Sequence, residues 1–279
     1  MYTAKIITDA GKTFNFGYEH GTLFDIEPLS GTDVNVLTSQ GTGQIGTTVE
    51  NQAVGGINRT ISGLVLNKET ATYLLSTLPA FTTGKLFVND VRYCNIVVNR
   101  TPEISFKKDG RMPFTMRVYC ATPFWSESQL KFKVLSGIIK MFKFPTKFNQ
   151  HMFGRTIQNA FINVFNEGDV STPLKCVFTS SATVENYGIQ NIRTFEKLEF
   201  NDTLRVGETA TVYFENTKLY AYKEDELGNV TQLIHAITDD SNLFLLTKGD
   251  NVLKSTADVN ESNLYATVSF RPQYMGVVV

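Results

Sequence analysis

The sequence predicts a mainly β chain that is divided into two domains. Apolar and polar residues alternate with period two over many short segments, which is typical of half-buried strands. Phe, Tyr and Trp make up 12% of the 279 residues, a surplus that favours strands over helices. The residue composition changes near residue 123, which indicates a domain boundary. A chain of this length can bury two hydrophobic cores of ordinary size.

The boundary is marked by the segment Arg117-Val-Tyr-Cys-Ala-Thr-Pro-Phe-Trp125. A clean alternating strand runs up to Cys120, and Pro123 then stops it, because proline has no N–H to donate and fixes φ. A lysine- and phenylalanine-rich segment follows, then longer strands with acidic turns. We therefore predict an N-terminal domain over residues 1–126 and a C-terminal domain from residue 127 onward.

The N-terminal domain begins with strands that are separated by glycine turns. The glycine-rich run over residues 41–56 has about the length of two strands, and it lacks the lysine that a phosphate-binding loop needs. This run predicts a long hairpin or arm. Arg59 follows among the apolar residues Ile57 and Ile61. It is either paired or at an interface, because an unpaired buried charge is too costly, or it reaches solvent from an edge strand.

One short helix is expected after this strand. Asn67 can cap it, apolar residues recur at helical spacing from Ala71 to Leu78, and Pro79 ends it. A hairpin turning at Asn89-Asp90 comes next. The strands over 93–98 and 114–120 then close the first domain, with Cys94 and Cys120 as apolar core thiols.

The C-terminal domain shows regularly spaced strands with turn signals between them, which predicts a sandwich or jelly roll. Its cleanest strand runs from Leu264 to Phe270. Three tyrosines on neighbouring strands, Tyr213, Tyr220 and Tyr222, lie opposite the apolar faces of those strands. They either bind a sugar or a partner from the outer face, or line a second core surface.

Little in the sequence points to chemistry. The three histidines are far apart, and no cysteine or histidine pair has metal-ligand spacing. No Gly-x-Ser-x-Gly elbow occurs, and the acidic clusters at 224–226 and 239–240 sit in turns where solvated acids are ordinary. The sequence therefore predicts neither an enzyme, nor a cofactor, nor a metal site.

Charge and hydropathy restrict the function further. A formal net charge of −1 argues against a dedicated nucleic-acid binder. Lysines are interleaved with phenylalanines over 131–148, a pattern that can bind single-stranded nucleic acid. A strand with one face in water and one in the core has the same spacing. We find neither a signal peptide nor an apolar run of membrane-spanning length, so we expect synthesis in the cytosol.

Four features in order resemble the distal tail proteins of siphovirus-type bacteriophages or prophages. They are Ile57-Asn-Arg-Thr-Ile-Ser-Gly with the leucine helix; Gly84-Lys-Leu-Phe-Val-Asn-Asp; Met116-Arg-Val-Tyr-Cys-Ala-Thr-Pro-Phe-Trp125; and, in the second domain, Asn166-Glu-Gly-Asp-Val-Ser-Thr-Pro, Leu204-Arg-Val-Gly-Glu, Lys248-Gly-Asp-Asn and Tyr274-Met-Gly-Val. The resemblance covers nearly the whole chain, and it is the order of the features that makes it specific.

This resemblance implies a structural hub at the virion tail tip. The N-terminal domain would be a β-rich sandwich or split barrel that forms a hexameric ring around the DNA channel. The C-terminal domain, over 127–267, would be a galectin-like β-sandwich that faces outward, and residues 268–279 would return to the first domain. The implied partners are further copies of the chain, the major tail tube protein, a tail-associated lysin or fibre-base protein, and a receptor-binding protein or host glycan; DNA would pass without specific binding.

Three sets of residues follow as candidates. The interdomain hinge is expected at Pro123, Phe124 and Trp125. The candidate ring contacts are Gly41, Gly43, Gly46, Gly55, Gly56 and Arg59. The candidate glycan or partner contacts are Tyr213, Tyr220 and Tyr222, and they support the alternative function, a carbohydrate-binding β-sandwich protein that contacts cell-wall glycans.

Overall fold

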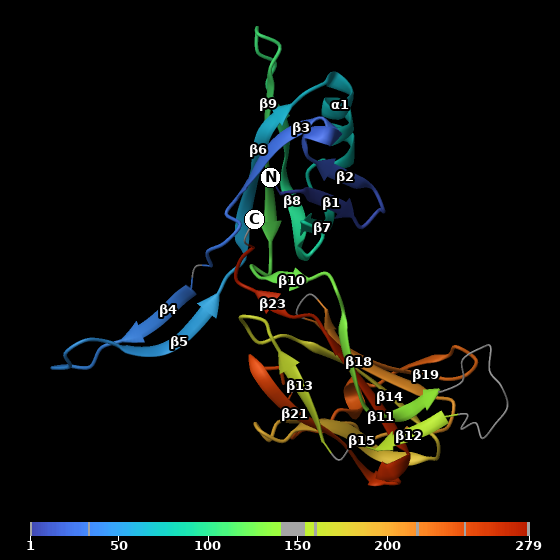
Figure 1. Cartoon of the computed structure of the whole chain (residues 1–279). Helices are drawn as coiled ribbons and strands as arrows, with labels where there is room; N and C mark the ends of the chain where they lie inside the picture. Colours follow the sequence, from blue (N-terminus) through green and yellow to red (C-terminus); the bar gives the residue numbers. More distant parts are fainter. Residues whose placement is uncertain are drawn as a thin grey trace. The chain divides into compact units, whose positions relative to one another are not determined.

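The computed structural model describes residues 2–32, 34–140, 154–158, 161–215, 218–242 and 244–277. For residues 136–140, 154–158 and 215 it describes the backbone alone. The chain divides into unit 1, Met1–Gln129 with Gln273–Val279, and unit 2, Leu130–Pro272. Antiparallel sheets make up both units, as Figure 1 shows, so the predicted mainly β fold class is confirmed.

Unit 1 is built on one nine-stranded sheet. Its main order is β2-β1-β7-β8-β9-β6-β3, with β10 paired to β8 and β23 paired to β10. The strands are β1 (Ala4–Thr8), β2 (Thr13–Phe16), β3 (Thr22–Glu27), β6 (Ile57–Val65), β7 (Thr83–Val88), β8 (Arg92–Ile104), β9 (Met112–Cys120), β10 (Trp125–Glu127) and β23 (Gln273–Tyr274). Alternate residues of these strands point into a single core, which explains the period-two pattern.

The predicted helix is present as α1 (Lys68–Thr77). The Asn67 side chain accepts a hydrogen bond from the Thr70 backbone N–H at 2.7 Å, which satisfies one of the donors at the helix start. Ala71, Leu74 and Leu78 are buried in the core of unit 1. Leu75 also lies in the helical pattern but is 41% exposed, because it falls at the edge of the apolar stripe.

The hairpin at Asn89-Asp90 is also confirmed. Both residues have positive φ, 50° and 55°, and the Val91 N–H donates to the Val88 carbonyl, so they are the two central residues of a tight turn. The next strand, β8, is longer than expected and runs on to Ile104, where a turn leads into β9.

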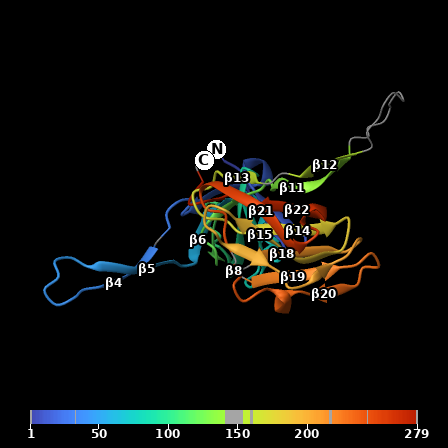
Figure 2. The same ribbon diagram turned by 90° about the horizontal axis from the view of Figure 1, so that it is seen from below.

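The glycine-rich segment forms an arm. β4 (Val34–Ser39) and β5 (Thr48–Val54) pair only with each other in a two-stranded sheet. The ribbon projects from the main sheet of unit 1 in both Figure 1 and Figure 2. The arm therefore begins near Val34, earlier than the expected start at residue 41, because its first strand lies ahead of the glycines.

Unit 2 is a sandwich of two antiparallel sheets over one core. The seven-stranded sheet has the order β12-β11-β22-β14-β18-β19-β20, and the other sheet has the order β13-β21-β15-β16 with β17 beside β15. The strands are β11 (Lys131–Lys140), β12 (Gly154–Gln158), β13 (Ile162–Asn166), β14 (Leu174–Ser180), β15 (Val184–Asn191), β16 (Lys197–Glu199), β17 (Thr203–Leu204), β18 (Thr209–Glu215), β19 (Lys218–Glu224), β20 (Val230–Gln232), β21 (Gly249–Val259) and β22 (Leu264–Phe270). Short 3₁₀ turns lie at Ile234–Ala236 and Glu261–Asn263 in unit 2, and at Tyr18–His20 in unit 1.

The unit borders differ slightly from the expected domain borders. Unit 1 extends to Gln129, three residues beyond the expected end at 126, because β10 pairs with β8 and stays in the first sheet. The C-terminal return begins at Gln273 and not at 268, because β22 runs to Phe270 inside the seven-stranded sheet of unit 2. The predicted run over 131–148 is a strand up to Lys140, and residues 141–148 lie outside the described residues.

Candidate functional site

The described part of the chain offers no grouping of His, Cys, Asp and Glu side chains that could hold a metal ion. In the same part, no helix has the length and apolar character that crossing a bilayer requires. The functional features to consider are therefore cavities, exposed surfaces and buried polar groups.

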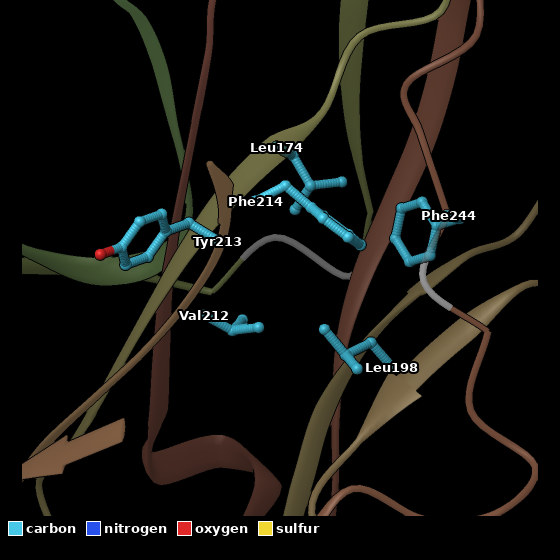
Figure 3. A pocket seen from close by; sticks show the side chains of 6 residues that line it. All are labelled: Leu174, Leu198, Val212, Tyr213, Phe214 and Phe244. Atoms are coloured by element: carbon cyan, nitrogen blue, oxygen red, sulfur yellow. The ribbon is translucent and has the colours of Figure 1, made fainter. Parts of the chain in front are cut away.

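The cavities are small or open. An apolar cavity of about 10 Å³ lies inside unit 2, lined by Leu174, Leu198, Val212, Tyr213, Phe214 and Phe244. Figure 3 shows Leu174, Leu198 and Phe244 turned toward one another, whereas the Tyr213 ring points away. This space is about the size of one water molecule. A second hollow, of about 170 Å³, lies in unit 1, where Lys5 is already paired with the exposed Asp90 at 2.7 Å.

The arm is an exposed apolar feature of unit 1. Every described residue of β4 and β5 is exposed. The exposed apolar side chains are Val34, Val36, Leu37, Ile45, Val49 and Val54, and Ile45 at the loop is fully exposed. An isolated two-stranded ribbon is marginally stable in water, and an exposed strand edge is a template for pairing with another chain. The arm is thus suited to pack against a second molecule.

The glycines of the arm have two different roles. Gly43 and Gly46 have positive φ, 81° and 84°, and form the loop between the strands. Gly56 lies at the base of the arm, where a Cβ atom would overlap the Tyr119 ring and the Cys120 carbonyl oxygen. Gly56 is therefore required inside unit 1, whereas a Cβ on Gly43, Gly46 or Gly55 would meet open space and one on Gly41 only the Gln44 side chain.

Arg59, one of the candidate ring contacts, is buried in the single chain, and a role in ring contacts stays a prediction. Its side chain is buried in unit 1 and the residue is 1% exposed. One guanidinium nitrogen donates to the Pro28 carbonyl and the other donates to the Pro123 carbonyl at 2.8 Å. β6 is an interior strand between β9 and β3, and Arg59 lies on its buried face, so backbone carbonyls take the place of water at two of its nitrogens.

Trp125 is fully buried in the same place. Its indole N–H donates to the Leu29 carbonyl at 3.0 Å, and the Arg59 guanidinium lies 4.5 Å from its ring centroid. Both contacts lie within unit 1. The hinge role of Pro123, Phe124 and Trp125 stays a prediction. The described contacts place Trp125 in the core of unit 1 and the Pro123 carbonyl against Arg59.

Three contacts fix the C-terminal return, residues 273–277, in unit 1 close to Leu29 and Trp125. The Val277 N–H donates to the Leu29 carbonyl at 3.1 Å, next to the Trp125 hydrogen bond. Arg92 donates to the Gly276 carbonyl at 2.5 Å, and its guanidinium lies 3.6 Å from the centroid of the Tyr274 ring. The last described residues therefore belong to unit 1.

The candidate tyrosines lie on the outer face of the seven-stranded sheet. Tyr213 and Tyr220 are cross-strand partners that stack on each other, with ring centroids 5.1 Å apart and planes 13° apart. The Lys175 ammonium lies 5.4 Å from the Tyr213 ring centroid on the neighbouring strand. The Tyr213 ring is thus in contact with Tyr220 and Lys175 of the neighbouring strands. Tyr222, two residues after Tyr220 on β19, is the cross-strand partner of Thr211.

Sequence reasoning missed a set of fully buried asparagines in unit 2. Asn251 donates to the carbonyls of Val164, Thr247 and Gly249, and it accepts a hydrogen bond from the Thr247 N–H at 2.9 Å. Asn166 donates to the Leu246 carbonyl at 3.0 Å. Asn191 lies beside Asn251.

These asparagines join two of the recognised motifs. Asn166 opens the segment at 166–173 and bonds the chain beside Thr247, whereas Asn251 ends Lys248-Gly-Asp-Asn and bonds the strand that leads to Asn166. An ion pair between Lys248 and Asp169 at 3.6 Å spans the same two loops. The motifs therefore occur together because they fold onto each other.

Comparisons with known proteins match the fold. No family model and no curated protein sequence matches the chain. Solved structures match the chain in their fold. The fold places the chain in the class of mainly β proteins with two units, one a sheet that carries a helix and the other a β-sandwich.

Within that class, the chain has the fold of a phage hub protein. The crystal structure of the SPP1 Dit (gp 19.1) protein, a paradigm of hub adsorption apparatus in Gram-positive infecting phages, matches with a TM-score of 0.70 and 13% identity over 98% of this chain and 99% of that one. Chains of the phage P2 baseplate in its activated conformation match with TM-scores of 0.52 with Ca and 0.51 with Sr. Both are 10% identical and cover 99% of this chain and 100% of that one. The fold that the resemblance implied is confirmed.

Proposed function

We propose that this protein is a distal tail protein, a structural component of a phage tail tip. It forms a hexameric hub ring that joins the tail tube to the baseplate and host-recognition apparatus and lines the DNA channel. The observation that carries this proposal is the fold match to the SPP1 Dit protein over 98% of the chain. No catalytic function is proposed, and the site of action is the virion tail tip.

The exposed arm supports ring formation. A closed ring needs a heterologous contact, in which one surface of a copy meets a different surface of the next copy. The arm offers such a surface, because its apolar side chains are exposed and it contains a single charged residue, Glu50, among described residues 34–56. A projecting ribbon of this kind buries apolar area only when a second molecule covers it.

The partners follow from the hub role. Further copies of the chain contribute to the ring, the major tail tube protein lies on one side, and a tail-associated lysin or fibre-base protein lies on the other. Unit 2 presents the outer face with Tyr220 and Tyr222 to a receptor-binding protein or a host glycan. These assignments rest on the fold and on the resemblance.

Removing the arm tests the ring directly. We expect a variant in which a short Gly-Ser link replaces residues 34–54 to fold normally but to form no ring, because the arm contributes no residue to either core. Native mass measurement of the full chain, alone and with its tail partners, checks this. Circular dichroism and thermal unfolding confirm that both units remain folded.

A matched pair of point variants sharpens this test. Val36 and Asn35 are neighbours on opposite faces of β4, and Val36 shares its face with Val34 and Val54. Val36→Asp is expected to weaken ring assembly more than Asn35→Asp, although both add one negative charge. Rings of unchanged size and stability after the deletion would refute the role of the arm.

A further inference from the structure

The guanidinium group of Arg59 is a buried cation without a carboxylate partner among the described residues. The residue is 1% exposed, and its described partners are two backbone carbonyls, at Pro28 and Pro123, and the Trp125 ring. Within the described part of the chain, the buried Nε has no hydrogen-bond acceptor. A buried charge is costly unless it is paired, so an anion close to Arg59 would remove most of this cost.

Two buried thiols share the core face of the sheet with this cation, because Cys120 is paired with Ile57, which lies two residues before Arg59 on the same face of β6. Cys94 on β8 and Cys120 on β9 are 1% and 0% exposed, and their Sγ atoms are 3.5 Å apart. This separation fits a hydrogen bond between a thiol and a thiolate. These cysteines and Arg59 are the ionisable groups that act on one another here, from strands β8, β9 and β6.

We infer that Cys120 is a thiolate that serves as the counter-ion of Arg59, and that the Cys94 thiol donates a hydrogen bond to it. The arrangement gives the cation an anionic neighbour inside the core and gives the thiolate both a hydrogen-bond donor and a positive charge. The pair belongs to the single chain, so it exists whether or not rings form.

The electrostatics agree with this assignment. The hydrogen bond from Cys94, and next the charge of Arg59, lower the pKa of Cys120 to about 7, although burial opposes the change. Burial is the main cause that raises the pKa of Cys94 well above its ordinary value. Above pH 7, one thiolate and one thiol are therefore the stable combination. Cys176 lies in the core of unit 2, where burial alone raises its pKa, and it is a natural control.

The pair makes the contacts around Arg59, Leu29 and Trp125 in unit 1 sensitive to pH. Arg59 bonds the Pro123 carbonyl before β10 and the Pro28 carbonyl next to Leu29, which in turn accepts from Trp125 and Val277. Protonation of Cys120 leaves Arg59 without its counter-ion, and the contacts that fix β10 and the C-terminal return weaken together.

The direction of the pH dependence follows from linkage. The folded-state pKa of Cys120, about 7, is below its ordinary value of 9.0, so its contribution is complete above pH 9 and is lost as pH falls through 7. The folding equilibrium of unit 1 gains on the order of 100-fold from this group over that range. The raised pKa of Cys94 acts oppositely above pH 9, so the stability of unit 1 is highest in the region of pH 8 to 9.

A titration of the folded full-length chain tests the inference. We expect ultraviolet thiolate absorbance to report one thiolate with a midpoint of about 7, and the emission of Trp125, the only tryptophan, to change with the same midpoint. Cys176→Ser is expected to leave both curves unchanged. Cys120→Ser is expected to abolish both transitions.

A second variant keeps the test decisive if Cys120→Ser does not fold. Cys94→Ala keeps Cys120 but removes its hydrogen-bond donor, so the midpoint is expected to rise by at least one pH unit, toward 9. The inference is overturned if no thiolate appears below pH 9 in the wild-type chain. It is also overturned if the transition near 7 survives in Cys120→Ser or keeps its midpoint in Cys94→Ala.

Discussion

Replacing Trp125 with alanine is expected to lower the free energy of unfolding of unit 1 by about 3–5 kcal/mol, the usual cost of removing a large buried aromatic ring. The residue is 0% exposed, and its ring lies over the buried Arg59 guanidinium. Its indole N–H donates a hydrogen bond to the Leu29 carbonyl. The same carbonyl accepts a hydrogen bond from the Val277 backbone N–H. The variant loses packing, a cation–π contact and a hydrogen bond at one point.

Hydrogen exchange of the full chain measures this effect within each unit. We expect amides of β10 and β23 to exchange faster in Trp125→Ala, while the amides of β14 and β22 in unit 2 keep their protection. Trp125→Phe is the matched control, because it keeps an aromatic ring and loses mainly the bond to Leu29, worth about 1 kcal/mol. Equal stability of Trp125→Ala and wild type would contradict the structural account of this residue.

Replacing Asn251 with alanine is expected to destabilise unit 2 by about 3 kcal/mol or more. Its side chain donates to three carbonyls and accepts from Thr247, and all of these groups are buried or partly buried. Each buried polar group that loses its partner costs about 1–3 kcal/mol, and the loop from Thr247 to Gly249 loses its internal support.

Asn163→Ala is the control for this change. Asn163 lies on β13 in the same sheet, is exposed, and has one described side-chain bond, to Asp250 at 2.7 Å. Its removal is expected to cost less than about 1 kcal/mol. Denaturant unfolding of the two variants against wild type makes the comparison. Similar losses in both would show that the buried asparagines are not what fixes the two motifs.

Local patterns predicted much of the fold. The alternation of Leu264 to Phe270 identified β22, and Asn67 with Ala71 and Leu74 identified α1, because neighbours along the chain determine both periods. The borders of the two units differ from the expected ones, because β10 pairs with β8 and β23 pairs with β10. These pairings join segments that are distant in sequence. Such pairings depend on the whole sheet.

The candidate site was less predictable for a similar reason. Arg59 was expected to be paired, at an interface or in solvent, and only the interior position of β6 selects the first of these. Asn166 and Asn251 look like ordinary turn residues, because nothing local shows that each bonds the other's segment. The stack of Tyr213 on Tyr220 depends on the register of β18 with β19.

The oligomeric state of the full chain is the most direct test of the hub proposal. We would measure native mass and image particles of the 31.2 kDa chain, alone and co-expressed with the tail tube and tail-lysin proteins of the same genome. The proposal predicts closed six-fold rings that bind these partners. A chain that stays monomeric at every concentration, and that associates with neither partner, would contradict it.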